Sequence, residues 1–495
     1  MKRSALFGAV YAANIVVLIP IILAGRLYID DLGRSIDGYF GWASDGRPLA
    51  ALLYYVVNLG SPAINIFPLP QILAAALISG VALMLANLFE QRKPLLLVLG
   101  SMPLAAQPYF LENLSYAYDS ITMSAGIFCS VAGAYVILTY KRPLNLALGV
   151  IFVVSALSLY QATLAIYFIV LVYFVLRQTA RSSWFDVPNL KRFWLGLLAL
   201  TTGLAFYFVL LKIFPFSSTH AGERAEIWSG SEMFVGILIN VSNYWNVLYS
   251  DWSGTWPGCL AATIALLGIF AASWPLRASN SLPRNFMQGG FVALSLVTLV
   301  ILSFGILLLM KNPVMAPRSF VALGILLTLF SLEWLDRIEH GPKFIRTWGL
   351  ARITTYLPVA LMAFSLIVVA YAYGRASGAQ KEFEMSFLTR LAYDIESIAV
   401  EEDISRIGFL GRFPASPILN KSQEKFPIIG RLVPIHIANN WWWGHVQLKH
   451  FGLRLNYYDV PKNLVEIIAD QGELPIRVSR SYRIYKFPDA LLVAF

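Results

Sequence analysis

The sequence predicts a polytopic α-helical membrane protein with a small polar domain at its C-terminal end. The chain has 495 residues, of which 58% are apolar and 13% are charged, and its mean hydropathy is +0.64. Soluble globular chains carry about 25% charged residues, because a soluble core needs a polar surface. The composition therefore excludes a soluble enzyme, a disordered chain and a disulfide scaffold.

Charge is concentrated near the C-terminus. Residues 375–495 hold 28 of the 66 charged residues, and residues 1–374 hold the other 38. We therefore predict a membrane domain over 1–374 and a C-terminal domain over 375–495. In the latter, 382–399 is predicted to be a helix, and 405–411, 428–433 and 476–487 are predicted to be strands of a small α/β module.

Eleven apolar segments predict membrane-spanning helices, because about 20 apolar residues cross the bilayer core as a helix. The fifth and sixth are short and closely joined. The first is too long and lacks a clean cleavage site, so we expect an uncleaved anchor rather than a signal peptide. The predicted spans are 5–24, 66–89, 94–111, 120–140, 144–158, 160–176, 193–214, 258–274, 288–309, 318–335 and 353–373.

Basic residues predict the orientation of these spans. With the N-terminus in the cytoplasm, the inner loops hold 16 Lys and Arg residues and the outer loops of the membrane domain hold 7. This bias follows the positive-inside rule, and an odd number of spans places the C-terminal domain outside. The same rule accounts for the net charge of +10 without nucleic-acid binding.

The loop after the first span contains two adjacent carboxylates, Asp30 and Asp31. The amphipathic stretch 32–43 and the stretch 48–59, which starts at Pro48, predict two short helices lying in the membrane interface. In one interpretation Asp30 caps a helix and Asp31 interacts with its dipole. In the other, one of them is a general base, because adjacent carboxylates raise each other's proton affinity.

Three further outer features are candidates for binding. Glu112, Tyr116, Tyr118 and Asp119 form either an aromatic belt or an acidic, sugar-binding wall. Basic side chains suit a phosphate, although snorkelling to lipid phosphates also explains them: Arg34, Arg47, Arg224, Lys311 and Arg318. The segment 215–257 reads as a long, polar, Trp-rich loop that could act as a lid.

The tryptophans Trp441, Trp442 and Trp443 are interpreted either as a carbohydrate platform or as a membrane-contacting belt. His436, His445 and His450 match no compact metal motif, so no metal is assigned. Cys129 and Cys259 lie in apolar runs, which makes a disulfide improbable.

The residues from Asp30 to Leu49 resemble the opening loop of the bacterial serotype-converting O-antigen glucosyltransferases. The similarity rests on Asp30-Asp31-Leu32-Gly33-Arg34-Ser35, Gly38-Tyr39, Gly41-Trp42 and Gly46-Arg47-Pro48-Leu49. Weaker similarity is found at 116–119 and at Tyr160-Gln161. Span number and topology also look like that family.

The resemblance implies a GT-C architecture in the bacterial inner membrane, with a periplasmic C-terminal domain. It implies transfer of glucose from undecaprenyl-phosphate-glucose to a hydroxyl of lipid-linked O-antigen, a lipopolysaccharide precursor, by a one-step inverting displacement. Asp30 is the favoured base, Gln161 joins the acceptor wall, and Trp42 joins the sugar-stacking candidates. A divalent metal is possible but not required.

Two alternatives stay open at this level. A lipid-linked oligosaccharide flippase would predict internal repeats and ionisable residues at mid-membrane. An O-antigen polymerase or ligase would also use periplasmic loops, but it does not account for the aspartate pair directly after the first span.

Overall fold

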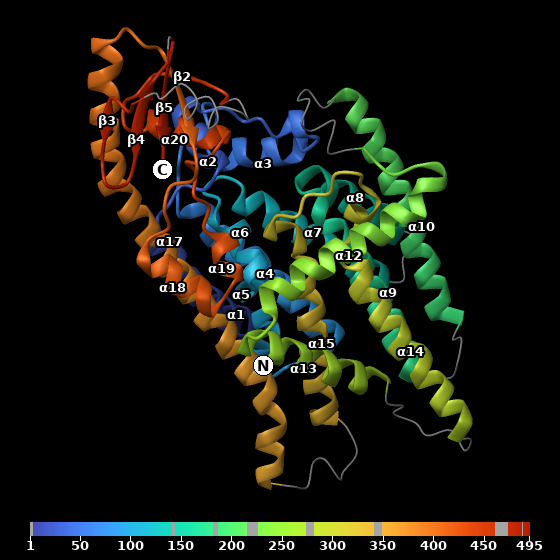
Figure 1. Cartoon of the computed structure of the whole chain (residues 1–495). Helices are drawn as coiled ribbons and strands as arrows, with labels where there is room; N and C mark the ends of the chain where they lie inside the picture. Colours follow the sequence, from blue (N-terminus) through green and yellow to red (C-terminus); the bar gives the residue numbers. More distant parts are fainter. Residues whose placement is uncertain are drawn as a thin grey trace.

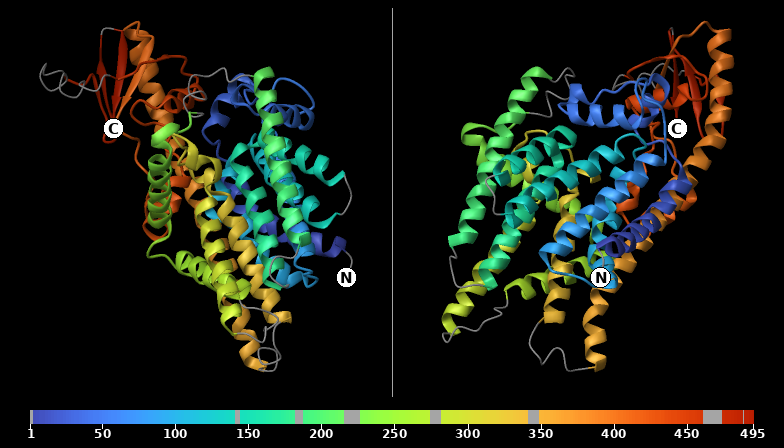
Figure 2. Two further views of the ribbon diagram at one scale, coloured as in Figure 1. Left: turned by 90° about the vertical axis from the view of Figure 1, so that its right-hand side faces the viewer. Right: turned by 180° about the vertical axis from the view of Figure 1, so that it is seen from behind.

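The computed structural model describes residues 3–140, 144–181, 187–214, 226–273, 282–340, 349–460, 474–487 and 489–495. The chain is mostly helical, with one small sheet near the C-terminus (Figure 1). In both views of Figure 2 the sheet lies at one end of the helical bundle, beside the last part of the long helix α17 (Gly349–Glu401).

The predicted spans fall in helical parts of the bundle, but the number of eleven is not confirmed. Length and composition qualify eight helical segments of the described chain as membrane-spanning, or nine if the bent pair α5 and α6 is one span. α8 is shorter, as is the described apolar part of α14. The several long apolar helices indicate a membrane protein. Besides α17, the helices in which the predicted spans fall are α1 (Arg3–Ala24), α4 (Leu69–Leu88), α5 (Pro94–Ala106), α6 (Pro108–Ser115), α7 (Ser120–Thr139), α8 (Leu144–Leu159), α9 (Leu164–Arg181), α10 (Val187–Ile213), α13 (Trp256–Ser273), α14 (Leu282–Leu302) and α15 (Ala322–His340).

The segment predicted as one span over 94–111 is broken. The helices α5 and α6 meet at an angle of 62°. The break falls at Gln107, which is extended because the following Pro108 disfavours a helical conformation in the residue before it. Every residue of α6 is buried. The bend therefore carries the polar end of α6, including Glu112, into the interior of the protein.

The first loop forms α2 (Asp30–Asp37), η1 (Ala43–Asp45) and α3 (Pro48–Val57). α3 begins at Pro48, as predicted. α2 starts two residues earlier than the predicted stretch and ends at Asp37, because Gly38 takes a left-handed conformation and its N–H bonds to the Arg34 carbonyl. The cap residue is Ile29, and no side chain caps the helix. The interpretation of Asp30 as a capping residue is therefore wrong.

The prediction of a polar loop over 215–257 is wrong for its described part, which starts at residue 226. It contains η3 (Gly230–Glu232) and the 20-residue helix α12 (Met233–Trp252). The polar side of α12 faces inward: Asn240 donates hydrogen bonds to the carbonyls of Leu308 and Met310, next to η4 (Gly305–Leu309). The opposite, apolar side is exposed, at Phe234, Leu238, Trp245 and Tyr249.

The C-terminal region combines helices with a five-stranded sheet of order β2-β1-β5-β4-β3. β1 pairs in parallel with β2 and β5, whereas β4 is antiparallel to β3 and β5. The strand prediction for 428–433 is wrong, because this segment is the helix α19; the segment 476–487 forms two strands. The elements are β1 (Arg406–Leu410), α18 (Pro417–Lys425), α19 (Ile428–Leu432), α20 (Trp442–Lys449), β2 (Asn456–Tyr457), β3 (Arg477–Val478), β4 (Arg483–Lys486) and β5 (Ala490–Ala494).

The helix α17 continues through residue 374, where the sequence predicts a domain boundary, and packs along α1 there. Gly374 allows this close approach. A Cβ at Gly374 would lie 2.4 Å from the Pro20 Cβ and 2.6 Å from two Pro20 backbone atoms. At Gly8 of α1, a Cβ would meet nothing within 4 Å.

We predict that Gly374→Ala lowers the thermal unfolding midpoint of the detergent-purified protein, because overpacking against backbone atoms costs about 1–3 kcal/mol. Gly8→Ala is the matched control and should leave the midpoint unchanged or slightly higher. Equal midpoints for the two variants would show that the α1–α17 contact is looser than described.

Candidate active site

Asp119, at the start of α7, is the centre of a buried polar cluster that joins the first loop to the bundle. Its Oδ1 accepts hydrogen bonds from the indole Nε1 of Trp42 at 2.6 Å and from Nη1 of Arg47 at 3.0 Å. Its Oδ2 pairs with Arg34. Burial acts to raise the pKa of Asp119, but the two guanidinium groups and the indole N–H outweigh it and hold the pKa below its ordinary value. Asp119 is therefore ionised at neutral pH.

Arg34 and Arg47 make further contacts besides their ion pairs with Asp119. Arg47 also donates to the carbonyl of Leu159 at 2.7 Å and to Oγ1 of Thr122 at 3.0 Å. Arg34 lies over the Trp42 ring, with its guanidinium carbon 4.2 Å from the ring centroid. Two cations share one carboxylate here, so the cluster keeps one excess positive charge.

Asp31 is fully buried and binds backbone rather than side chains. Its Oδ2 accepts the N–H of Ala117 at 2.7 Å and of Tyr28 at 3.2 Å, and its Oδ1 accepts the N–H of Tyr118 at 3.4 Å. Burial raises the pKa of Asp31 to about 8, and the Ala117 N–H acts in the opposite direction. Asp31 thus ties α2 to the α6–α7 connection, away from solvent.

Asp30 differs from Asp31 both in its burial and in its hydrogen bonding. Its side chain is partly exposed, and within the described part of the chain its carboxylate takes part in no hydrogen bond or ion pair. Removal from bulk water raises the pKa of Asp30 and Arg34 lowers it, with the net pKa above its ordinary value. A half-buried carboxylate with free oxygens and a raised pKa is suited to accept a proton from a substrate hydroxyl.

The backbone just before Asp30 is strained. Ile29 has φ 45° and ψ −101°, a conformation that β-branched residues rarely adopt. Such a residue costs about 1–3 kcal/mol and persists only where its surroundings enforce it. The first turn of α2 is therefore set by contacts from outside the helix.

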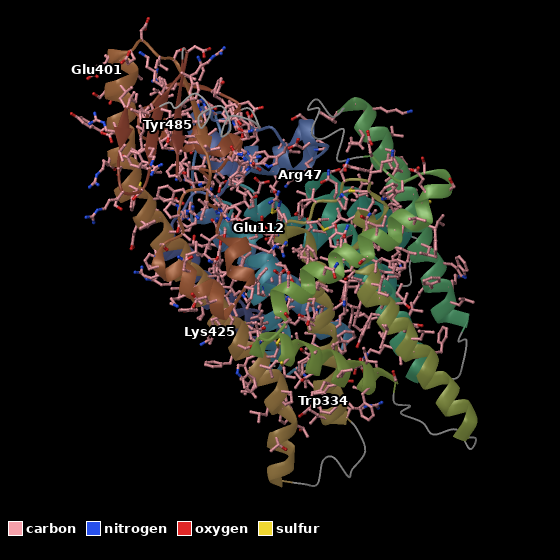
Figure 3. All side chains as sticks on the ribbon, viewed as in Figure 1. Arg47, Glu112, Trp334, Glu401, Lys425 and Tyr485 are labelled. Atoms are coloured by element: carbon pink, nitrogen blue, oxygen red, sulfur yellow. The ribbon has the colours of Figure 1, made fainter. Side chains whose placement is uncertain are left out.

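Glu112 and Arg318 form a second ion pair beside the first cluster. Glu112 accepts hydrogen bonds from the backbone N–H and from Nη1 of Arg318, both at 2.6 Å. Arg318, in η5 (Pro317–Phe320), also donates to the Tyr116 hydroxyl at 2.9 Å, and its side chain is 23% exposed. Figure 3 shows Arg47 and Glu112 toward the sheet-bearing end of the molecule, far from Trp334 of α15.

Several predicted sugar-binding side chains lie in packing positions instead. Trp42 and Tyr118 are fully buried in one aromatic core with Tyr54. Gln161 donates to the Asp45 carbonyl and to the Tyr207 hydroxyl, both at 3.1 Å. The rings of Trp42 and Tyr118 are thus covered by packing, whereas Gln161 is only partly buried.

Other predicted residues are not brought to the clusters. Lys311 is exposed and pairs with Glu226 at 3.8 Å, and Arg224 lies outside the described residues. The C-terminal tryptophans are split between two environments. Trp443 packs near Gly33 of α2, whereas Trp442 is 48% exposed beside Tyr457. Among the described residues, no group of three or more His, Cys, Asp or Glu side chains could hold a metal ion.

Sequence reasoning missed the residues of the C-terminal region that contact the first loop. Arg26 pairs with Glu384 of α17 at 2.8 Å, and the Tyr28 hydroxyl donates to the Leu432 carbonyl at 2.9 Å. His436 accepts a hydrogen bond from the Ile29 N–H. More than 350 residues separate these partners, and no sequence pattern in the chain signals such contacts.

Comparison with known proteins assigns the chain to a family. Residues 19–329, more than half of the chain, match the sequence profile of the family described as glucosyl transferase GtrII. The chain belongs to the GtrII glucosyltransferase family. The match extends from α1 into α15 and includes the Asp30, Asp119 and Glu112–Arg318 positions.

A protein of Salmonella phage P22 is similar to this GtrII-family chain along almost its full length. It is described as the uncharacterized 55.3 kDa protein in the gtrB 5' region. The two are 27% identical over 448 residues, which cover 90% of this chain and 89% of the phage protein. No solved structure is significantly similar to the chain. The family supports glucosyltransferase activity, and sugar donor and acceptor substrates in general.

We predict that Asp119→Asn destabilises the GtrII-family chain strongly, because it leaves two buried guanidinium groups without a carboxylate. Removing one partner of a buried pair costs about 3–5 kcal/mol. Asp37→Asn, at the exposed end of α2, is the control and should change the thermal midpoint little.

The pH dependence of this difference has a defined sign. Because the pKa of Asp119 is lowered in the folded state, its stabilising contribution is complete above the unfolded carboxyl pKa of about 4. It is lost as the pH falls through the folded pKa. The gap in thermal midpoint between wild type and Asp119→Asn should therefore be constant from pH 8 to about pH 5 and shrink at lower pH. A gap that instead grew on acidification would contradict an ionised Asp119.

Proposed function

We propose that this GtrII-family chain transfers glucose from undecaprenyl-phosphate-glucose to a hydroxyl of lipid-linked O-antigen. The observation that carries the proposal is the unengaged carboxylate of Asp30, which lies among cationic and aromatic side chains at one end of a membrane bundle. Family membership supports the glucosyl group. The polyprenyl-phosphate donor and the O-antigen acceptor follow from the similarity of the first loop to serotype-converting enzymes.

The proposed reaction is a single inverting displacement at the anomeric carbon. An acceptor hydroxyl oxygen attacks that carbon as its proton passes to Asp30, and the bond from the carbon to the phosphate oxygen breaks. The electron pair leaves with the lipid phosphate. General-base assistance contributes about 10²–10⁴-fold to such a step.

Arg318 is the proposed partner of the departing phosphate. Glu112 fixes Nη1 and the backbone N–H of Arg318, and the guanidinium is partly exposed and close enough to Asp30 to lower the pKa of that carboxyl. A guanidinium fixed in this way before the reaction stabilises charge that develops on the leaving group. Arg34 and Arg47 are engaged by Asp119, so in this proposal they add positive potential to the site rather than direct phosphate contacts.

The proposed site faces the periplasm. The predicted inner loops are more basic than the outer ones, which supports an outer position for the loop of Asp30 and for the C-terminal region. In this proposal, lipid-linked sugars reach the site from the outer leaflet of the bacterial inner membrane.

We predict that Asp30→Asn lowers the rate of labelled glucose transfer about 10²–10⁴-fold with little change in donor KM, because only proton acceptance is lost. Purified protein, sugar-labelled donor and lipid-linked O-antigen are sufficient for the measurement. Asp31→Asn should lower the thermal midpoint as well as activity, whereas Asp37→Asn should leave both near wild type.

The same assay separates the alternative functions. Full activity of Asp30→Asn at wild-type expression would remove Asp30 from the reaction. Absence of transfer by wild type, together with movement of labelled lipid between the leaflets of liposomes, would favour a flippase. Elongation or ligation of O-antigen without any glucosyl donor would favour a polymerase or ligase.

A second prediction concerns the leaving group. Arg318→Gln should lower the turnover rate about 10²–10³-fold, because an electrostatic contact to the developing phosphate charge is lost. Lys311→Gln removes a basic residue of the same outer segment that pairs with Glu226, and it should retain near-normal turnover. The double variant Glu112→Gln/Arg318→Gln leaves no unpaired buried carboxylate, so it should fold and still be slow. Normal turnover by the double variant would contradict the role of Arg318.

A further inference from the structure

Residues 432–450 of the C-terminal region hold the segment that carries Asp30 through four polar contacts. Arg26 donates to the Pro434 carbonyl at 2.6 Å, and the Tyr28 hydroxyl donates to the Leu432 carbonyl at 2.9 Å. The N–H of Ile29 donates to Nε2 of His436 at 3.4 Å. On the first turn of α2, the Leu32 carbonyl accepts from Nε2 of His450 at 3.1 Å. We call Leu432, Pro434, His436 and His450 the C-terminal clamp.

One contact of the clamp reaches a strained residue, Ile29. Leu432, the last residue of α19, and Pro434 and His436, which follow that helix, contact the chain from Arg26 to Ile29. The last of these contacts reaches Ile29, whose φ of 45° is unfavourable for a β-branched residue. Ile29 is the residue before Asp30, so its φ and ψ angles set the direction of the Asp30 side chain.

We propose that His436 is a positioning residue for Asp30: by accepting the Ile29 N–H it holds the strained backbone that aims the carboxylate into the site. The proposal rests on the proposed function in one respect, the role of Asp30 as the base. It assigns the C-terminal region a part in the reaction that does not require contact with either substrate.

The chemical state of His436 fits this task. A backbone N–H is a donor, so Nε2 must be the acceptor and the ring proton lies on Nδ1. The side chain is 1% exposed, and Nδ1 has no hydrogen-bond partner in the described structure. Burial and the nearby Arg26 and His450 hold the pKa of His436 well below its ordinary value. The ring is therefore neutral, and Nε2 stays an acceptor at neutral pH.

The other anchors allow this one contact to be removed alone. Arg26 bonds Glu384 of α17 through both carboxylate oxygens, at 2.8 and 3.0 Å, and Tyr28 keeps its bond to Leu432. Asp31 keeps its three backbone donors. Loss of the His436 acceptor should therefore release Ile29 without detaching the C-terminal region.

The test compares three variants of the full-length protein in detergent. His436→Leu removes the acceptor, and His436→Gln restores one, because the Gln amide oxygen reaches the position of the His Nε2. His445→Leu is the matched control: the same change in the same region, at a histidine that contacts Trp442 and Tyr457 rather than the first loop.

We expect His436→Leu to lower kcat about 10–100-fold with donor KM within about twofold of wild type, because misplacing a reacting group by about 1 Å can cost 10²-fold. His436→Gln should recover most of the rate, and His445→Leu should keep it. Equal rates for His436→Leu and His445→Leu, or no recovery in His436→Gln, would overturn the proposal.

Amide hydrogen exchange tests the contact independently of activity. The Ile29 amide should exchange faster in His436→Leu than in wild type or His436→Gln, while the amides of α3 stay unchanged. No acceleration at Ile29 would overturn the clamp, whatever the rates. If the Ile29 amide exchanges faster in His436→Leu but the wild type transfers no glucose, the clamp stands and the proposed function is contradicted instead.

Discussion

The candidate site depends first on the carboxylate of Asp119. One ionised group, removed from water, binds Arg34, Arg47 and the Trp42 indole, and so joins three successive pieces of the first loop to the start of α7. The loop would otherwise lie on the membrane surface with two arginines in water. Because α2 is held through Arg34, the position of Asp30 is a consequence of this cluster, and the aromatic core around Trp42 seals it.

The C-terminal region also holds the first loop, through contacts to the segment between α1 and α2. The bond from Ile29 to His436 and the pair of Arg26 with Glu384 link the end of α1, the first turn of α2 and the long helix α17. The chain between α1 and α2 is thus fixed at both ends. A base held this way needs no reorganisation when the substrates arrive, which is the condition under which electrostatic and proton-transfer catalysis are most effective.

Local sequence patterns predicted most of the helices, but they could not predict contacts between residues far apart in the sequence. Apolar runs predicted the long helices of the bundle and Pro48 predicted the start of α3, because both signals act within one turn or one span. Gln107 and Pro108 carry a local signal for the bend in α5–α6 that was not used. The sequence does not predict the helix α12, because its polar residues are typical of a solvent-facing loop, whereas Asn240 bonds carbonyls next to η4. The sequence assigns Trp42 to sugar stacking, because its burial depends on a distant partner, Asp119.

The stereochemistry of the transferred glucose tests the central claim most directly. A single free carboxylate that acts as a base implies one displacement at the anomeric carbon. The account predicts that the anomeric configuration in the product, read by NMR of the glucosylated acceptor, is opposite to that in the polyprenyl-phosphate donor. Retention of configuration would require a covalent or second displacement and would contradict the role assigned to Asp30.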